Sequence, residues 1–190
     1  MKRVSFRVTA FALAVACVSA SQVVHAQNAA GGSIMADFTD DVDGVQKKLV
    51  ALAKAMPADK MGWRPGAGVR SVGEVFLHVA SDNYFIPSGM GHAMPASTGI
   101  KPNDFASVTA YEKRALSKDQ IVAELEQSFA HLRAAMAKST PASLTAPVSM
   151  FGMKSTGQGM WLLTATHLHE HLGQAIAYAR MNGVVPPWSK

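Results

Sequence analysis

The segment from Met160 to Gly183 limits the possible folds of this chain more than any other stretch. Apolar and ring-bearing side chains recur in it every three or four residues, which is the period of one face of an α-helix. The sequence therefore predicts an amphipathic helix here. Its predicted inward face consists of Met160, Leu163, His167, His171, Gln174, Tyr178 and Met181.

Two histidines lie on this predicted inward face. His167 and His171 are one helical turn apart, so their side chains lie one above the other and can bind a single metal ion. His169 points to nearly the opposite face of the helix, and Glu170 also lies outside the predicted inward face. Burial removes the hydration of both rings unless a metal ion or another partner satisfies them. Two interpretations stay open from the residues alone: a metal site, or core histidines that are hydrogen-bonded without any ion.

Three earlier segments also have helical periodicity. Residues 34–56 carry apolar side chains at every third or fourth position and end at Pro57. Ser71 and Glu74 form a capping box that opens a second helix, and Pro87 is predicted to break it. A third long helix begins after Ser117, where Gln120 takes the place of Glu in the same capping pattern. With the last helix, these segments predict an all-α fold, an antiparallel four-helix bundle.

The predicted second helix contributes a third inward histidine. His78 shares a face with Val75, Asp82 and Phe85. Metal sites in helix bundles form where facing helices direct polar side chains into the core, so His78 can meet His167 and His171. Three neutral histidines on a divalent ion leave at least one coordination position open, as in catalytic zinc sites. Asp82, one turn past His78, is the candidate catalytic base of this site.

The connections between these helices differ in character. Residues 87–102 hold three glycines and three prolines and predict a loop that lies over the metal site as a lid. Residues 103–116 predict a short helical turn, and residues 148–153 predict an extended segment over the core. His92 is expected to be a solvated loop histidine, and Trp63 is expected to cover one end of the core.

The first 26 residues have the pattern of a cleaved secretory signal peptide. Lys2, Arg3 and Arg7 precede an apolar stretch, and a small-x-small site ends at Ala26. The stretch is too short to be a membrane span. Residues 27–33 then predict a flexible tether, and residues 34–190 the helical domain. The expected location is the periplasm or the exterior, with a lipid anchor on Cys17 as the alternative.

Charge and cysteine content restrict the range of possible functions further. The chain has 18 basic and 13 acidic residues, and without the three basic residues of the predicted signal the net charge is +2. No cluster of basic residues with interleaved aromatics suggests nucleic-acid binding. Cys17 is the only cysteine, so the mature domain would have no thiol nucleophile of its own.

Three stretches together resemble the DinB family, also called the DinB/YfiT-like four-helix bundle. They are the histidine-bearing SVGEVFLHVASDNYF, the H-x-x-x-H-x-G-Q pattern, and the Y-x-R-x-x-G-x-x-x-P pattern that closes the chain. The sharpest part of the resemblance is HLHEHLGQAIAYARMNGVVPP, which contains the last two. The resemblance covers residues 34–190 and implies a divalent metal bound by His78, His167 and His171, in a protein that often pairs as a homodimer. Many relatives have a His-His doublet where this chain has Glu170 and His171.

The resemblance implies a reaction class without naming a substrate. Characterised relatives include thiol-dependent transferases and isomerases that use mycothiol or bacillithiol, which are made inside the cell. The chain is therefore expected to be an exported metal-dependent transferase or hydrolase that acts on a small molecule, with zinc or nickel as the metal. A non-catalytic exported metal- or ligand-binding module is the alternative. A pocket with an acid or hydroxyl within reach of the metal would favour the enzyme; a metal sealed by side chains would favour the module.

Overall fold

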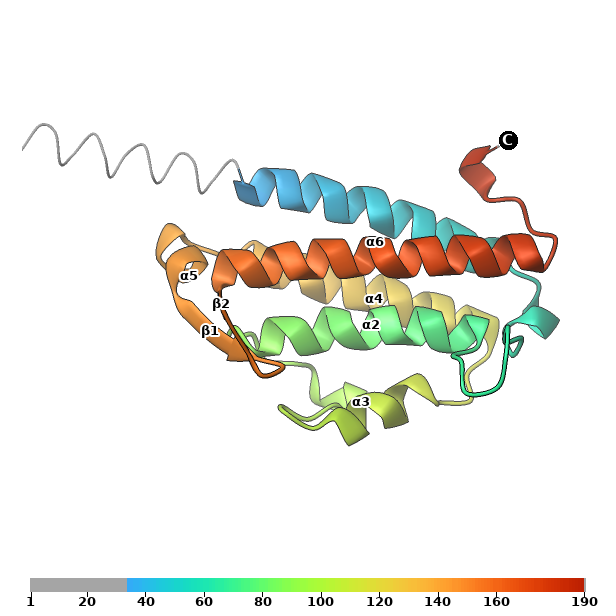
Figure 1. The fold of residues 1–190 in the computed structure, drawn as a ribbon, viewed down its shortest axis with the longest axis horizontal. Helices are drawn as coiled ribbons and strands as arrows, with labels where there is room; N and C mark the ends of the chain where they lie inside the picture. The colour runs from blue at the N-terminus through green and yellow to red at the C-terminus, as the bar shows by residue number, and fades with distance from the viewer. Residues whose placement is uncertain (1–33, 190) are drawn as a thin grey trace, which may run out of the picture.

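The computed structural model describes residues 34–189, and the predicted signal peptide and tether lie outside these residues. Four long helices build this part of the chain: one over residues 34–55, α2 (Val72–Ser88), α4 (Lys118–Met136) and α6 (Gly157–Met181). They lie roughly alongside one another as a bundle (Figure 1). The predicted all-α four-helix bundle is confirmed.

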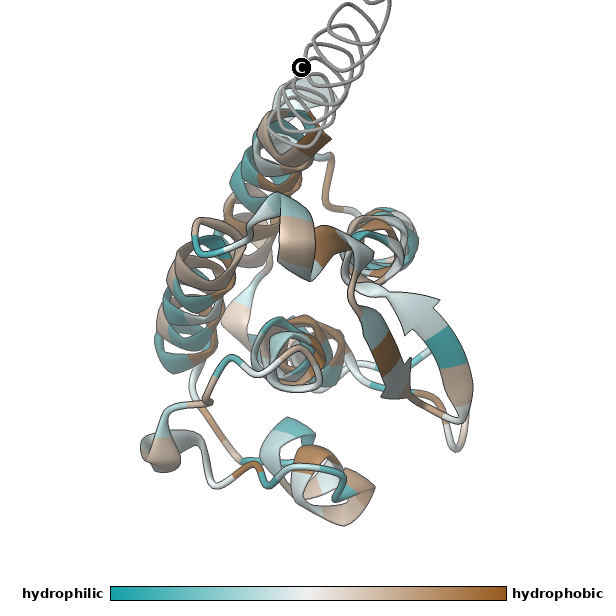
Figure 2. Cartoon of the chain, turned by 90° about the vertical axis from the view of Figure 1, so that its left-hand side faces the viewer, coloured by the Kyte–Doolittle hydropathy of each residue, from teal (hydrophilic) through white to brown (hydrophobic). Residues whose placement is uncertain are grey.

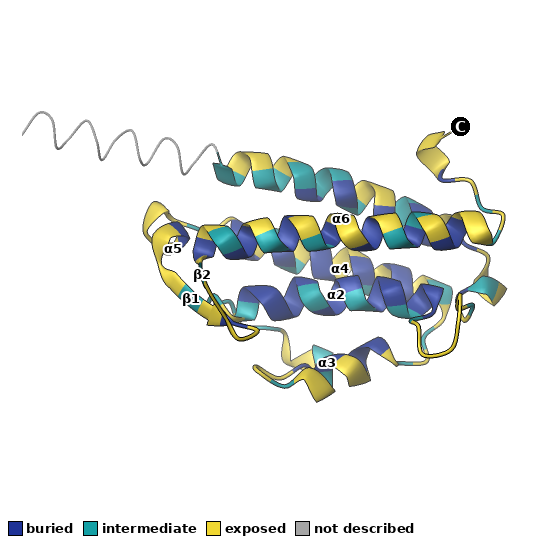
Figure 3. Ribbon diagram, viewed as in Figure 1, coloured by how far each residue is buried: buried dark blue, intermediate teal, exposed yellow. Residues whose placement is uncertain are grey.

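Helix α2 is the central helix of the bundle. It packs against α4, α6 and a shorter helix, α3 (Phe105–Glu112). Side chains are buried on nearly every side of α2, as Figure 3 shows by its mostly dark blue ribbon. A helix that is apolar all round is stable only when neighbours cover each face. The short helical turn predicted within residues 103–116 is α3, and this helix covers the side of α2 left open by the other three.

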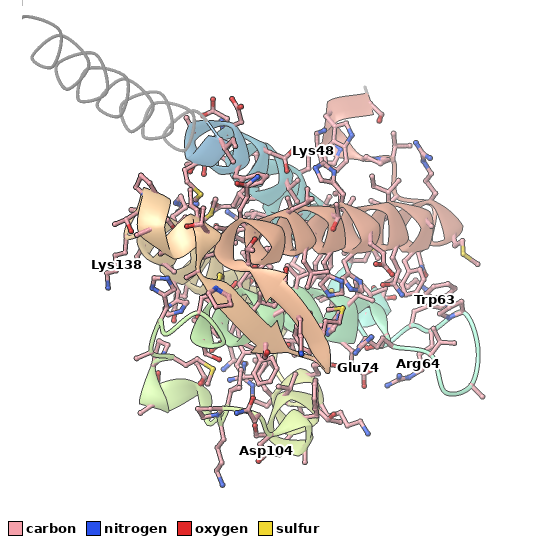
Figure 4. All side chains as sticks on the ribbon, turned by 60° about the vertical axis from the view of Figure 1, so that its left-hand side comes forward. Lys48, Trp63, Arg64, Glu74, Asp104 and Lys138 are labelled. Carbon is pink, nitrogen blue, oxygen red and sulfur yellow. The ribbon has the colours of Figure 1, made fainter. Side chains whose placement is uncertain are left out.

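The predicted capping boxes are both present. Ser71 accepts a hydrogen bond from the backbone of Glu74, and the Glu74 carboxylate accepts one from the backbone of Ser71. Ser117 and Gln120 do the same at the start of α4. Glu74 also receives two hydrogen bonds from Arg64, and Figure 4 labels both side chains. The helix ends one residue after the predicted break, because Pro87 lies within α2 and the last helical residue is Ser88.

The connection between α4 and α6 contains a helix and a hairpin. Helix α5 (Pro141–Thr145) is followed by β1 (Pro147–Met150) and β2 (Met153–Thr156). The strands pair antiparallel, with Pro147 opposite Thr156 and Met150 opposite Met153. The predicted extended segment is thus the first strand and the turn of a hairpin. In the end-on view of Figure 2, the hairpin and α3 flank α2 on neighbouring sides.

The ends of the bundle are closed by short segments. The 3₁₀ helices are η1 (Ala58–Lys60), η2 (Ala96–Thr98) and η3 (Pro187–Ser189). Trp63 packs edge-on against the ring of Tyr178 on α6, with centroids 5.4 Å apart, so it covers the core end as predicted. His92 lies in the loop as predicted and outside the histidine cluster, but it is only partly exposed, with its ring centroid 6.1 Å from that of Trp161. None of the helices among residues 34–189 is long and apolar enough to cross a membrane.

The buried face of α6 differs slightly from the predicted stripe. Met160, His171 and Tyr178 are buried as expected, but Met181 is 63% exposed. Trp161, Leu168 and Leu172 are buried beside the predicted stripe. Met181 was misplaced because it is the last residue of α6, where no other helix remains to pack against it.

Candidate metal centre

The three predicted histidines come together between two helices. His78 projects from the middle of α2, and His167 and His171 project from successive turns of α6. One ring nitrogen from each lies within 4.8 Å of the others. The Nε2 atoms of His167 and His171 are 3.1 Å apart. In a tetrahedral zinc site, nitrogens bound at about 2.05 Å stand roughly 3.3 Å from one another, so this spacing suits two ligands of one ion.

Hydrogen bonds to the far side of two rings fix their orientation. The Nδ1 of His78 donates to Glu112 Oε1 at 2.7 Å, and the Nδ1 of His171 donates to Gln174 Oε1 at 2.9 Å. A proton held on Nδ1 leaves the lone pair of Nε2 free, and this is the usual arrangement behind metal-binding histidines. The donor set therefore fits a divalent metal ion.

Both orienting residues are themselves held in place. Glu112 is buried at the end of α3 and accepts hydrogen bonds from Arg70 at 2.8 and 3.3 Å. Gln174 donates to the hydroxyl of Tyr178 at 3.1 Å. Each of the two imidazoles is thus the inner member of a chain of polar contacts, which restricts the ring to one orientation.

Asp82 lies inside the histidine cluster. Its Oδ2 is 2.7 Å from Nε2 of His167 and 3.3 Å from Nε2 of His78. The carboxylate therefore stands at the same nitrogens that converge on the candidate metal position. This places the predicted base within reach of any group bound there.

The surroundings shift the pKa values of His167, His171 and Glu112 in different directions. The hydrogen bond to Asp82 raises the pKa of the His167 imidazole above its ordinary value, although burial opposes this effect. Burial lowers the pKa of His171 to about 4, so this ring is neutral at pH 7. Burial would raise the pKa of Glu112, but hydrogen bonds from His78 and Arg70 hold it below its ordinary value. The neutral ring of His171 and the ionised carboxylate of Glu112 are the forms that metal binding requires, whereas a metal at this position would have to displace the proton that Asp82 favours on His167.

A pocket of about 360 Å³ opens onto this cluster. His78, Asp82 and His167 form part of its wall, together with Arg70 and Glu112. The apolar part of the wall comes from α2, α3, the hairpin and α6. It consists of Phe85, Ile86, Phe105, Val108, Phe151, Met153 and Leu163.

The predicted lid is wrong in its location. No residue of 87–102 lines this pocket; α3 and the β1–β2 hairpin cover it instead. Glycine and proline content identified a loop correctly but could not show which way the loop turns. Residues 89, 90 and 92 border a separate small cavity, of about 180 Å³, beside Trp161 and α5.

The family is established by comparison with known proteins. A model of the DinB superfamily matches residues 42–175, most of the described chain. The chain belongs to the DinB superfamily. The resemblance inferred from the histidine motifs is therefore confirmed. No match was found among proteins with curated functions.

Solved structures of DinB-like proteins share the fold. A DinB-like protein from Bacillus cereus is 18% identical, with a TM-score of 0.62, over 81% of this chain and 93% of its own. YfiT from Bacillus subtilis is described as a probable metal-dependent hydrolase with an unusual four-helix bundle topology. It is 17% identical, with a TM-score of 0.63, over 80% of this chain and 89% of its own. A conserved protein from Enterococcus faecalis is 15% identical, with a TM-score of 0.62, over 75% and 93%.

Sequence reasoning missed two functional residues of this DinB bundle. Glu112 lies 34 residues after His78, in a segment without a recognisable pattern, and it reaches the site only because α3 folds against α2. Arg70 directly precedes the capping box at Ser71, but nothing in the sequence shows that its side chain turns toward Glu112. His169 was placed correctly: it points away from the cluster and contacts Asp41 of the first helix at 2.8 Å.

Proposed function

We propose that this protein is a metal-dependent hydrolase of a small molecule, with the metal held by His78, His167 and His171. The observation that carries the proposal is the pocket, which opens on two of these histidines and has the Asp82 carboxylate in its wall. A bundle that bound metal only for structure would have no need of such access. The description of YfiT as a probable metal-dependent hydrolase adds support from a protein of the same fold.

The residues around the candidate metal position have different roles. Glu112 and Gln174 hold two rings with Nε2 toward the metal position, and His167 and Asp82 line the entrance from the pocket. A divalent ion bound there would act as a Lewis acid and lower the pKa of a bound water or thiol. Zinc and nickel both suit imidazole ligands.

Asp82 is the residue we assign to proton transfer. Its Oδ2 is within 3.3 Å of two ligand nitrogens, so a nucleophile at the metal position is within hydrogen-bond reach of the carboxylate. An acceptor at this place could take the proton of a bound water, and the choice of hydrolysis over transfer from a thiol rests on the description of YfiT as a probable metal-dependent hydrolase. The non-catalytic binding module is less well supported, since the cluster is open to a pocket rather than sealed.

The location and assembly of the protein are proposed from the sequence and the family resemblance. We propose export through the signal peptide of residues 1–26, with the periplasm or the exterior as the destination. A homodimer is part of the same proposal, from the family resemblance.

Metal content tests the ligand assignment. The purified protein should hold close to one equivalent of divalent metal, measured by mass spectrometry of the metal, and His78→Ala and His167→Ala should lose it. His169→Ala is the matched control, because this histidine lies on the same helix and faces away. Metal retained in the first two variants, with the fold intact, would refute the three-histidine site.

The role of Asp82 needs a separate measurement. Asp82→Asn should keep the metal and lower the turnover of a hydrolysable ester or amide, selected by screening, by about 100-fold or more. Full turnover by this variant would remove Asp82 from the proton-transfer step while leaving the metal assignment standing.

A further inference from the structure

The pocket beside the candidate metal centre has an unusual wall of three phenylalanine rings. Phe85 comes from α2, Phe105 from the start of α3 and Phe151 from the turn of the hairpin. Their ring centroids are 5.5, 6.0 and 5.9 Å apart. These separations fall within the range at which aromatic rings attract one another. Three separate elements thus contribute one ring each to a single wall.

Two of these rings remain open to solvent. Phe105 is 59% exposed and Phe151 is 38% exposed, whereas Phe85 is buried. Exposed aromatic surface gathered beside a functional site is characteristic of ligand-binding surfaces. When a ligand covers such surface, apolar area is removed from water, and this lowers the free energy of the complex. A core would have buried all three rings.

Phe151 is held in a backbone conformation that phenylalanine rarely adopts. Its φ is +56°, and Gly152 after it has φ +73°, so both turn residues are left-handed. Two-residue hairpin turns of this kind favour Asn or Gly, which tolerate positive φ. Strain of this sort, when it is observed, points to a functional role for the side chain. Here the strained residue places its ring in the pocket wall.

Part of the pocket wall is polar. Arg70, His78, Asp82 and Glu112 belong to this part. A volume of about 360 Å³ is near the lower limit for small-molecule sites. The pocket therefore has room for one ring-sized apolar group joined to one polar, reactive group.

We propose that the substrate of this enzyme carries a compact apolar group of the size of an aryl ring, which Phe85, Phe105 and Phe151 bind. The reactive group of the substrate then faces His78, His167 and Asp82. This inference rests on the proposed function, since the histidines are taken as the metal-binding end of the pocket. It adds a substrate class that the metal site alone does not specify.

Two hydroxamates test the inference. Both bind a metal through the same group, but benzohydroxamate carries a phenyl ring and acetohydroxamate only a methyl group. Calorimetry with the zinc-loaded protein should show benzohydroxamate binding at least about tenfold more tightly, from the additional apolar surface buried. Phe105→Ala and Phe151→Asn should remove this preference and leave the affinity for acetohydroxamate unchanged.

The variants are chosen so that loss of folding cannot imitate the result. Asn fits the left-handed backbone at position 151, so Phe151→Asn removes the ring without straining the turn. Leu162→Ala is the matched control, because Leu162 is an exposed apolar residue of α6 that does not line the pocket. It should keep the full preference for benzohydroxamate.

Each outcome decides between the two proposals. Equal affinity for the two hydroxamates in the unaltered protein, or a preference that survives in both phenylalanine variants, would overturn the aryl-binding wall and leave the metal site intact. Binding of neither hydroxamate would contradict the proposed function. In that event, benzyl alcohol and the metal-free protein test the wall directly by NMR. Binding that is lost in Phe105→Ala and Phe151→Asn supports the wall, and absence of binding overturns it.

Discussion

At the scale of single residues, Glu112 shows how a site depends on a side chain outside its motifs. Its carboxylate accepts hydrogen bonds from His78 on one side and from Arg70 on the other. A negative charge behind an imidazole increases the ability of the ring to donate electrons to a metal. Glu112 therefore fixes the orientation of the His78 ring, with Nε2 directed toward the candidate metal position.

Glu112→Gln is expected to weaken metal binding by about 10- to 100-fold. Glutamine can still accept a hydrogen bond from His78 Nδ1 but provides no charge, and Arg70 loses its ionic partner. Competition with a metal-chelating dye measures the affinity. Glu126→Gln serves as the control, since Glu126 pairs with Lys54 on the surface at 2.8 Å. Equal affinity in the Glu112→Gln variant and the unaltered protein would show that the carboxylate has no part in the site.

At the scale of secondary-structure elements, the start of α2 is stabilised by one carboxylate with two functions. Glu74 closes the capping box with Ser71 and also receives both terminal nitrogens of Arg64, at 2.6 and 2.8 Å. The Arg64 hydrogen bonds hold the pKa of Glu74 below its ordinary value, although partial burial opposes them. The fixed start of α2 in turn fixes the position of His78, two turns later.

This pKa shift predicts how stability depends on pH. Because the folded pKa of Glu74 is depressed, its contribution to stability is complete above the ordinary value of 4.5 and is lost as the pH falls through the folded pKa. Urea unfolding between pH 7 and pH 3 should show a smaller loss of stability for Glu74→Gln than for the unaltered protein. Glu126→Gln should follow the unaltered protein. Parallel curves for Glu74→Gln and the unaltered protein would contradict the assignment.

Alanine substitutions at two glycines of α6 should change the stability of the protein in opposite directions. A Cβ at Gly157 would lie 2.2 Å from the carbonyl oxygen of Ser143 in α5, whereas a Cβ at Gly173 would meet nothing within 4 Å. Gly157→Ala should therefore destabilise the protein by about 1–3 kcal/mol, because α5 must move. Gly173→Ala should stabilise it by up to about 1 kcal/mol, from the helix preference of alanine. Urea unfolding measures the free energy of unfolding of both variants. A lower value for Gly173→Ala than for the unaltered protein would contradict the observation that a Cβ at position 173 meets no other atom.

At the scale of the whole molecule, the candidate metal would link the two helices that carry the site. His78 belongs to α2 and the other two histidines to α6, and no covalent bond joins these helices near the site. A ligand that binds only the folded state stabilises it according to its concentration and affinity. The metal is therefore expected to stabilise the bundle as well as to act in catalysis.

Removal of the metal by a chelator should lower the free energy of unfolding. At a free metal concentration of 100 times Kd, the stabilisation is about 2.7 kcal/mol. Thermal unfolding with and without zinc measures it, and His78→Ala should show no such shift. An equal shift in His78→Ala would mean that the metal binds elsewhere.

The helices of this protein follow from local signals. Apolar spacing and the capping boxes at Ser71 and Ser117 depend only on neighbouring residues, so they can be recognised without the fold. The two histidines of α6 are related by helix geometry in the same way. The missed hairpin has strands of four residues, too short for a clear alternating pattern.

The amino-acid sequence by itself determined the four long helices, their starts, and the pairing of His167 with His171, because each depends on residues within a few turns of one another. Only the tertiary structure decided that Glu112 stands behind His78, that Asp82 reaches His167, and that α3 and the hairpin, rather than residues 87–102, enclose the pocket. These contacts join residues 34 to 85 positions apart, or elements on different sides of the bundle. Their formation depends on how the helices pack, and no local pattern in the sequence records that packing.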